Sequence, residues 1–152
     1  MKIVFTKSKK TLALGSKIIM LYQRCDYSHV AIQDGDFFYQ ASEGKINKEH
    51  ITHFSREHAI VHSYDIPHIN IVKLEKELGR NYSIGQNLGI LFVDFFKNIG
   101  KRVKNPFRSS GVNCSEFVYT SVIIPLYGDL GYDKESIKPK RIKEILEERV
   151  PL

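Results

Sequence analysis

The first half of the chain alternates short apolar runs with turn signals, a pattern that predicts a sheet. Each run is rich in β-branched, aromatic or long aliphatic residues, and each is short for a helix. An Asp-Gly-Asp triplet at 34–36 separates two of the runs and indicates a hairpin, and Pro67 ends the last run. The sequence therefore predicts four strands, at residues 16–23, 28–33, 37–42 and 58–66.

Beyond residue 70 the apolar positions recur at helical spacing. Asn113 is suited to cap a helix over 114–124, which Pro125 would end. Three further helices are predicted, over 71–79, 83–100 and 138–149. Because strands come first and helices follow, we expect an α+β fold with helices packed on an antiparallel sheet, in one domain spanning residues 1–152.

Composition and charge are those of an ordinary soluble protein with a basic surface. Of 152 residues, 42% are hydrophobic and 26% charged, and the net charge is +6. This balance favours anionic partners such as phospholipid, a cell-wall polymer or nucleic acid, and no nucleic-acid-binding motif is recognisable. The N-terminus lacks a secretion-signal pattern, and the apolar stretch 88–96 falls far short of the ~20 residues that span a bilayer. The default expectation is a cytoplasmic protein, and one released by cell lysis would look the same.

Two cysteines, Cys25 and Cys114, are present, and their spacing matches neither a zinc site nor a disulfide-rich framework. Cys114 follows Asn113 at the predicted start of a helix, where backbone N–H groups and the helix dipole favour a thiolate. Such a cysteine is a candidate nucleophile, and the same N–H groups could stabilise an oxyanion. The alternative is a small hydrophobic residue of the core.

A thiol nucleophile requires a base, and His29 is the histidine best placed to be one. It shares a strand face with Ala31, opposite Val30 and Ile32, so its small neighbour leaves room for a partner. The alternative is a histidine with a purely structural role. The remaining histidines fall on polar connections or a solvated strand face and are expected at the surface: His50, His53, His58, His62 and His68.

A third group in such a site orients the imidazole, and the hairpin places strand 37–42 beside His29. The polar candidates there are Gln40, Ser42 and Glu43. The carboxamide oxygen of Gln40 could accept the Nδ1–H of the ring, whereas Glu43 would hold an imidazolium more strongly but lies at the end of the strand. Both could instead be solvated residues.

Six segments follow one another in the order GSKIIMLYQ, YSHVAI, FFYQASEGKI, GRNYSIGQN, NCSEFVYT and IKPKRIKEIL. This series, over roughly residues 12–147, resembles the circularly permuted NlpC-like branch of the papain-like hydrolases. The branch includes YiiX-like proteins and, more distantly, the lecithin:retinol acyltransferase family. The resemblance implies a small barrel-like antiparallel sheet with Cys114 as nucleophile, His29 as general base and Gln40 as orienting group. Relatives commonly carry Glu or His at that third position, so Glu43 remains an alternative.

The resemblance implies attack of the thiol on an amide or ester carbonyl through an acyl-enzyme, without a metal or organic cofactor. It implies a cell-wall peptide, which we expect first, or a lipid acyl group as substrate. An apolar stripe in the predicted helix 83–100, followed by basic residues, would suit an anionic membrane, although it is more typical of a core-facing helix. The alternative from another class is a non-catalytic basic module that binds anionic lipid or nucleic acid.

Overall fold

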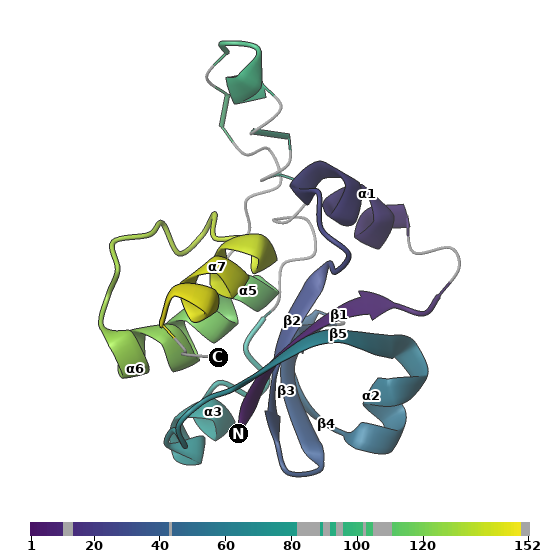
Figure 1. The fold of residues 1–152 in the computed structure, drawn as a ribbon, viewed down its shortest axis with the longest axis vertical. Helices are drawn as coiled ribbons and strands as arrows, with labels where there is room; N and C mark the ends of the chain where they lie inside the picture. The colour runs from purple at the N-terminus through teal and green to yellow at the C-terminus, as the bar shows by residue number, and fades with distance from the viewer. Residues whose placement is uncertain are drawn as a thin grey trace.

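The computed structural model describes residues 1–10, 14–42, 44–81, 89, 92–93, 96–101, 103–104 and 111–149. Within them one antiparallel sheet has the strand order β4-β3-β2-β1-β5 (Figure 1). The strands are β1 (Lys2–Ser8), β2 (His29–Asp34), β3 (Phe37–Ser42), β4 (Lys45–His50) and β5 (His58–Asp65). No ladder joins β4 to β5 among these residues, so the described sheet is open rather than a closed barrel.

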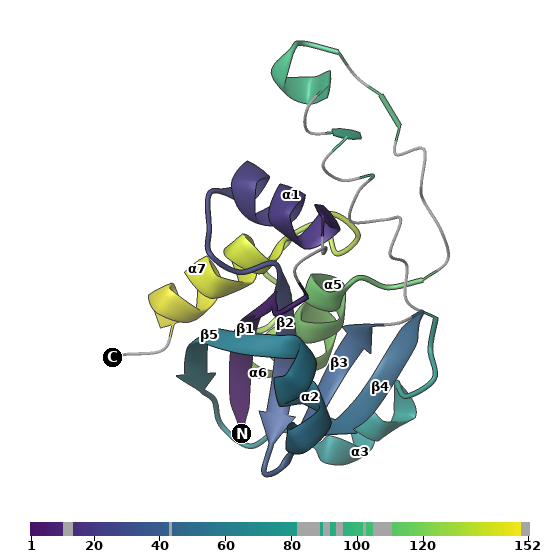
Figure 2. The same ribbon diagram turned by 90° about the vertical axis from the view of Figure 1, so that its right-hand side faces the viewer.

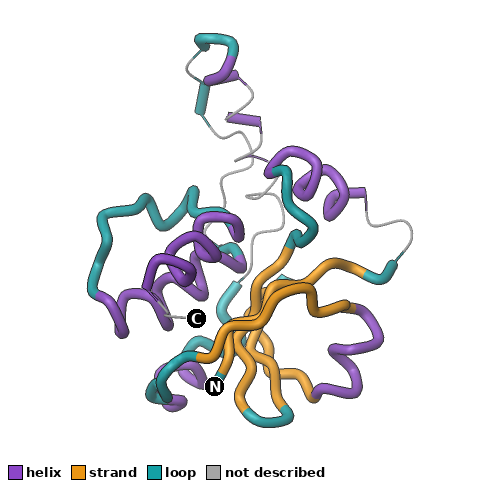
Figure 3. Tube along the Cα trace, in the orientation of Figure 1, coloured by secondary structure: helices purple, strands orange, loops and turns teal. Residues whose placement is uncertain are grey.

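Helices flank the sheet, which confirms the α+β class (Figure 3). They are α1 (Leu14–Gln23), α2 (Ile51–Glu57), α3 (Ile71–Lys76), α5 (Cys114–Val118), the π-helical η1 (Tyr119–Ile123), α6 (Ile124–Tyr127) and α7 (Pro139–Arg149). The helices α5, α6 and α7 lie on one side of the sheet and α2 lies on the other (Figures 1 and 2). Among the described residues, every helix is too short or too polar to cross a lipid bilayer.

The hairpin of β2 and β3 is confirmed, and it carries two of the candidate site residues. The strands pair around a turn in which Gly35 has φ +54°, a backbone angle that favours glycine. Val30 and Ile32 face the large core cluster beneath α5 and α7, whereas Ala31 faces the smaller cluster beneath α2. Because side chains alternate along a strand, His29 begins β2 on the same face as Ala31, as predicted.

The predicted strand at 16–23 is wrong, because this segment is the helix α1. A run of four apolar residues fits a buried strand and a helix equally well, and only a longer context separates the two. Most side chains of α1 are exposed or half-buried, so the run does not form a core strand. The strands β1 and β4 and the helix α2 are additions to the expected elements.

The helix that begins at Cys114 extends beyond its predicted end at Pro125. The helical backbone continues through η1 and α6 to a C-cap at Gly128, whose φ is +82° and whose N–H donates to Ile124 O at 2.9 Å. In η1 the N–H of Ile124 donates to Tyr119 O, five residues earlier. This wider turn tolerates a proline, which has no N–H and would clash with the carbonyl of a regular turn.

The other predicted helices differ in how far the structure describes them. The helix predicted at 71–79 is confirmed as the shorter α3, and the helix predicted at 138–149 is confirmed as α7. Most of the predicted helix 83–100, including Leu88, Leu91 and Phe95 of its apolar stripe, lies outside the described residues.

Candidate active site

The fold brings Cys114 and His29 together. Cys114 is the first residue of α5, and His29 is the first residue of β2. The two side chains lie close enough for each to shift the pKa of the other. Cys114 is only 1% exposed, whereas His29 keeps partial exposure, so the pair is not fully sealed from solvent.

Asn113 fixes the start of the helix that carries the thiol. Its backbone is extended, and its side-chain oxygen accepts a hydrogen bond from the N–H of Glu116 at 2.8 Å, as an N-cap does. Its side-chain nitrogen donates to the Glu135 carbonyl at 3.2 Å, which ties the cap to the loop before α7. The buried cap therefore holds Cys114 in the first helical turn, as the sequence predicts.

The surroundings of Cys114 favour a thiolate. Burial alone would raise the pKa of Cys114, but the charge and hydrogen bond of His29 lower it below its ordinary value. The backbone N–H of Val30 and the hydroxyl of Ser115 add smaller contributions in the same direction. Burial alone would likewise lower the pKa of His29, but Cys114 and Gln40 raise it. The opposite shifts are those of a thiolate–imidazolium pair.

Gln40 contacts the far side of the His29 ring, through a different nitrogen from the one expected. Its Oε1 lies 2.9 Å from Nε2 of His29, and Gln40 is 2% exposed. A carboxamide oxygen only accepts, so Nε2 carries a proton and Nδ1 is the ring nitrogen left for the thiol. The expectation that Nδ1–H would bond Gln40 is therefore wrong.

Glu49, on the neighbouring strand β4, orients Gln40 in turn. The Gln40 side-chain nitrogen donates to Glu49 Oε2 at 2.7 Å. Since a carboxylate accepts only, this bond directs the nitrogen of the amide toward Glu49 and its oxygen toward His29. Cys114, His29, Gln40 and Glu49 thus form a continuous chain of contacts, which we call the four-residue array.

Sequence reasoning missed Glu49 because it did not place a strand at 45–50. In the β3–β4 ladder Glu49 pairs with Phe38 and lies diagonal to Gln40. A hairpin predicted after Ser42 would have placed Glu49 beside Gln40. The other candidate for the third group, Glu43, lies outside the described residues. Gln40 therefore contacts His29 directly, and the carboxylate of Glu49 contacts Gln40.

His58 is wrongly expected at the surface. It is half-buried at the start of β5 and stacks on His29, with ring centroids 5.3 Å apart, and on Phe54 at 4.6 Å. Burial first, and then the charge of His29, lower the pKa of His58 to about 4. The His58 ring is therefore neutral near pH 7 and adds no positive charge beside His29. The expectation is correct for His50, His53 and His68, which are exposed.

We expect replacement of Glu49 by alanine to slow alkylation of Cys114 at pH 7 about five- to tenfold, the size of one ordinary hydrogen bond. The amide of Gln40 could then rotate, and its nitrogen would face His29. Alkylation by iodoacetamide over a range of pH measures both the rate and the apparent pKa of the thiol. Glu49→Gln keeps an acceptor oxygen and should restore most of the rate. Equal loss in both variants would show that Glu49 does not act by orienting Gln40.

His58 should also make stability depend on pH. Its pKa is about 4 in the folded protein against an ordinary 6.5, so between these values only the unfolded chain binds the proton. Stability therefore falls as pH drops through this window, by up to about 2 kcal/mol from pH 7 to pH 5. Urea unfolding of wild type and His58→Phe at both pH values tests this.

Burial, rather than the charges around His58, sets the sign of that comparison. His29 and Lys10 lower the pKa of His58, whereas Glu57 raises it, and burial outweighs all three. His58→Phe keeps the stack on Phe54 but has no proton to bind, so this variant should lose less stability at pH 5 than wild type. An identical loss in the two proteins would assign the acid sensitivity to other groups.

The described residues include no group of three or more His, Cys, Asp or Glu side chains arranged to hold a metal ion. The chain matches no protein-family model, no curated protein and no solved structure.

Proposed function

We propose that this protein is a cysteine hydrolase that cleaves an amide or ester through an acyl-enzyme. The observation that carries the proposal is the pairing of Cys114 with an imidazole whose other nitrogen is held by Gln40. A small hydrophobic core residue would need no such partner. The non-catalytic alternative is weaker for the same reason, because a binding module has no use for a buried thiolate beside an imidazolium.

In the proposed first step, the thiolate of Cys114 attacks the carbonyl carbon of the substrate and a C–S bond forms. The carbonyl electrons move to oxygen, and the tetrahedral intermediate then collapses with loss of the amine or alcohol. His29 donates the proton from Nδ1 to that leaving group. A thioester on Cys114 and a neutral imidazole remain.

In the second step, His29 acts as the base. Its Nδ1 takes a proton from water as the oxygen of that water attacks the thioester carbonyl. Collapse releases the carboxylic acid and returns the electron pair of the C–S bond to sulfur, which restores the thiolate–imidazolium pair. No other co-reactant is required, and the array begins and ends in the same protonation state.

The proposed roles of the surrounding groups follow from their contacts. Gln40 keeps the ring of His29 turned so that Nδ1 faces the sulfur, and Glu49 keeps the amide of Gln40 in the matching orientation. The backbone of Val30 lowers the pKa of Cys114, and its N–H is the proposed donor beside the reacting atoms. Being neutral, Gln40 supports the imidazolium less than a carboxylate would, and Glu49 supplies a negative charge one contact further away.

We propose a cell-wall peptide amide as the substrate class and a lipid acyl ester as the second candidate. The second is favoured by an outward-facing apolar surface on α1, described below. The test is to incubate the protein with wall peptides and, separately, with phospholipids, to quench in acid and to measure its intact mass. An adduct on Cys114 equal to the acyl part of one substrate would identify the reaction. Adducts that appear equally on Cys25 would contradict it.

A further inference from the structure

In the helix α1 the apolar face points to solvent and polar side chains face the protein, the reverse of a usual surface helix. Successive residues are rotated by about 100°, so Leu14, Ile18 and Leu21 share one face. These three side chains are 68%, 51% and 81% exposed. We call them the α1 apolar face. A group of large aliphatic side chains at the surface commonly marks a site where a partner or a membrane binds.

Polar contacts to the body of the protein fix this orientation. The hydroxyl of Ser16, on the opposite side of α1, forms a hydrogen bond with the hydroxyl of Ser28. Near the end of the helix, the side-chain oxygen of buried Gln23 accepts from the backbone N–H of Lys140 at 3.3 Å. A rotation of α1 that buried its apolar face would break both contacts, so the outward direction of that face is built into the fold.

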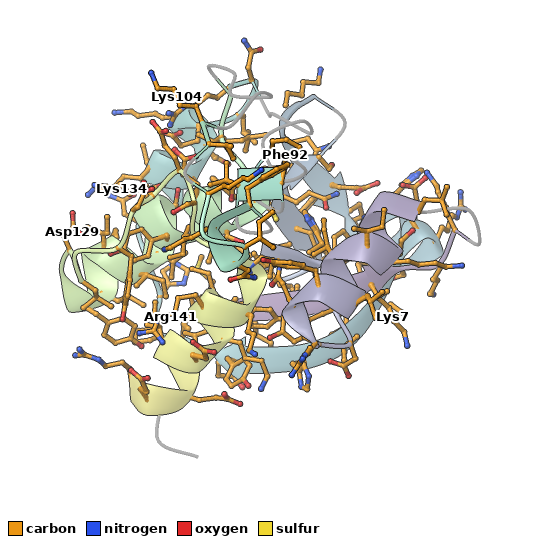
Figure 4. All side chains as sticks on the ribbon, turned by 90° about the horizontal axis from the view of Figure 1, so that it is seen from above. Lys7, Phe92, Lys104, Asp129, Lys134 and Arg141 are labelled. Carbon is orange, nitrogen blue, oxygen red and sulfur yellow. The ribbon has the colours of Figure 1, made fainter. Side chains whose placement is uncertain are left out.

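Basic side chains border the α1 apolar face. Leu21 lines a surface hollow together with Lys7 and Arg24, and Lys17 is exposed one residue before Ile18. Viewed from above, Lys7 lies on the side of the molecule that carries α1, away from Lys134 (Figure 4). Asp26 is the acidic residue of this hollow, and it contacts His62 at 3.3 Å.

We propose that the α1 apolar face docks on the surface of an anionic phospholipid membrane. Leucine and isoleucine side chains would enter the boundary of the acyl chains, and the bordering Lys and Arg would contact the headgroups. A wall polymer offers negative charge but no apolar phase for these side chains. A second copy of the chain would bring Lys7, Lys17 and Arg24 against like charges, and the net charge of +6 adds to that repulsion.

Docking in this way would bring the four-residue array close to the membrane. Ser28, the partner of Ser16, immediately precedes His29, and α1 lies at the end of the sheet where β2 begins (Figures 1 and 2). The proposal is independent of the reaction that the array performs, because it concerns binding and not turnover.

The test uses the absence of tryptophan from this chain. Leu21→Trp, made together with Cys114→Ala so that no chemistry interferes, places a single indole on the α1 apolar face. Its emission should shift to shorter wavelength with vesicles of phosphatidylglycerol and phosphatidylcholine, and not with pure phosphatidylcholine vesicles. Emission that stays unchanged with both vesicle types, together with no sedimentation of the protein with them, would overturn the proposal.

Matched variants distinguish docking through α1 from nonspecific binding of the protein to vesicles. In the Cys114→Ala background, Ile18→Ser with Leu21→Ser should weaken sedimentation with anionic vesicles at least about tenfold. Val72→Ser, which removes an exposed apolar residue from α3, should leave it unchanged. Lys17→Glu should weaken it about fivefold or more, unlike Lys73→Glu on α3. Equal effects in the members of either pair would contradict docking through α1.

Self-association is the competing outcome, and the same protein reports on it. An indole emission already shifted in vesicle-free buffer, with a doubled mass by light scattering that Leu21→Ser abolishes, would assign the face to a second copy and overturn membrane docking. Alkylation of Cys114 without vesicles tests the proposed hydrolase separately, so either proposal can fail without the other.

Discussion

Replacing His29 with alanine should slow alkylation of Cys114 by iodoacetamide at pH 7 by about 30- to 100-fold. In wild type, His29 lowers the pKa of the thiol against the opposing effect of burial. Without the imidazole, only the smaller effects of the Val30 N–H and the Ser115 hydroxyl oppose burial, and the pKa of Cys114 rises. An unassisted thiol is only a few per cent thiolate at pH 7, pairing with an imidazole raises that fraction, and the rate follows it.

The dependence on pH distinguishes this cause from a change in access. The rate of wild type should level off at a lower pH than that of His29→Ala, which should rise about tenfold with each pH unit near neutrality. The substitution removes a ring beside the sulfur and opens the site, so slower reaction cannot result from steric hindrance. Equal rates and parallel pH profiles in the two proteins would rule out activation of the thiol by His29.

Cys25 is the internal control for that experiment. Burial first, and then the charge of Asp26, raise the pKa of Cys25, although the backbone of Tyr27 acts in the opposite direction. Cys25 should therefore react slowly near neutral pH, and Cys25→Ser should leave the fast reaction unchanged. Peptide mapping of the alkylated protein assigns each rate to its cysteine.

Replacing Cys114 with alanine should abolish turnover of any substrate that forms the adduct, with a loss of at least about 10³-fold. Cys114 is the proposed nucleophile of the array, because His29 transfers the proton. Gln40 and Glu49 hold the orientation of the His29 ring. Cys114→Ser keeps the shape of the side chain, but its hydroxyl remains protonated beside the imidazole and should lose nearly as much activity. Product formation measured by mass spectrometry gives both values.

A folding control is needed because Cys114 belongs to the large core cluster. Removal of its sulfur leaves a small cavity, with an expected cost of about 1 kcal/mol that urea unfolding would measure. Such a loss is too small to unfold an ordinary domain and cannot explain a thousandfold loss of turnover. Cys25→Ser should retain full activity. Residual activity of Cys114→Ala above one tenth of wild type would refute the assigned nucleophile.

Local sequence patterns were sufficient to predict the features that depend on a single turn, cap or strand. The Asp-Gly-Asp triplet at 34–36 defines the β2–β3 hairpin, because the turn requires a residue that tolerates positive φ and the flanking strands follow from it. Asn113 caps the helix that begins at Cys114, because its side chain can satisfy an N–H of the first turn. Alternation along β2 sets the face that His29 occupies.

Elements whose neighbours decide their structure were not predictable. The run 18–21 forms an outward-facing helix rather than a buried strand, because Ser16 and Gln23 find partners on the body of the protein. β1 shows no alternation because both of its faces are covered. β4 is mostly polar because it lies at an edge of the sheet, so hydrophobicity does not reveal it.

By itself, the sequence determined that Cys114 begins a helix, that His29 lies on a strand and that Gln40 lies on the paired strand, because turns, caps and side-chain alternation are local properties of the chain. Only the tertiary structure decided that the Cys114 thiol meets the His29 ring, that Glu49 stands behind Gln40 and that His58 stacks on His29. These contacts join segments far apart in the sequence. Their geometry depends on strand register and helix packing, which arise when the whole core forms.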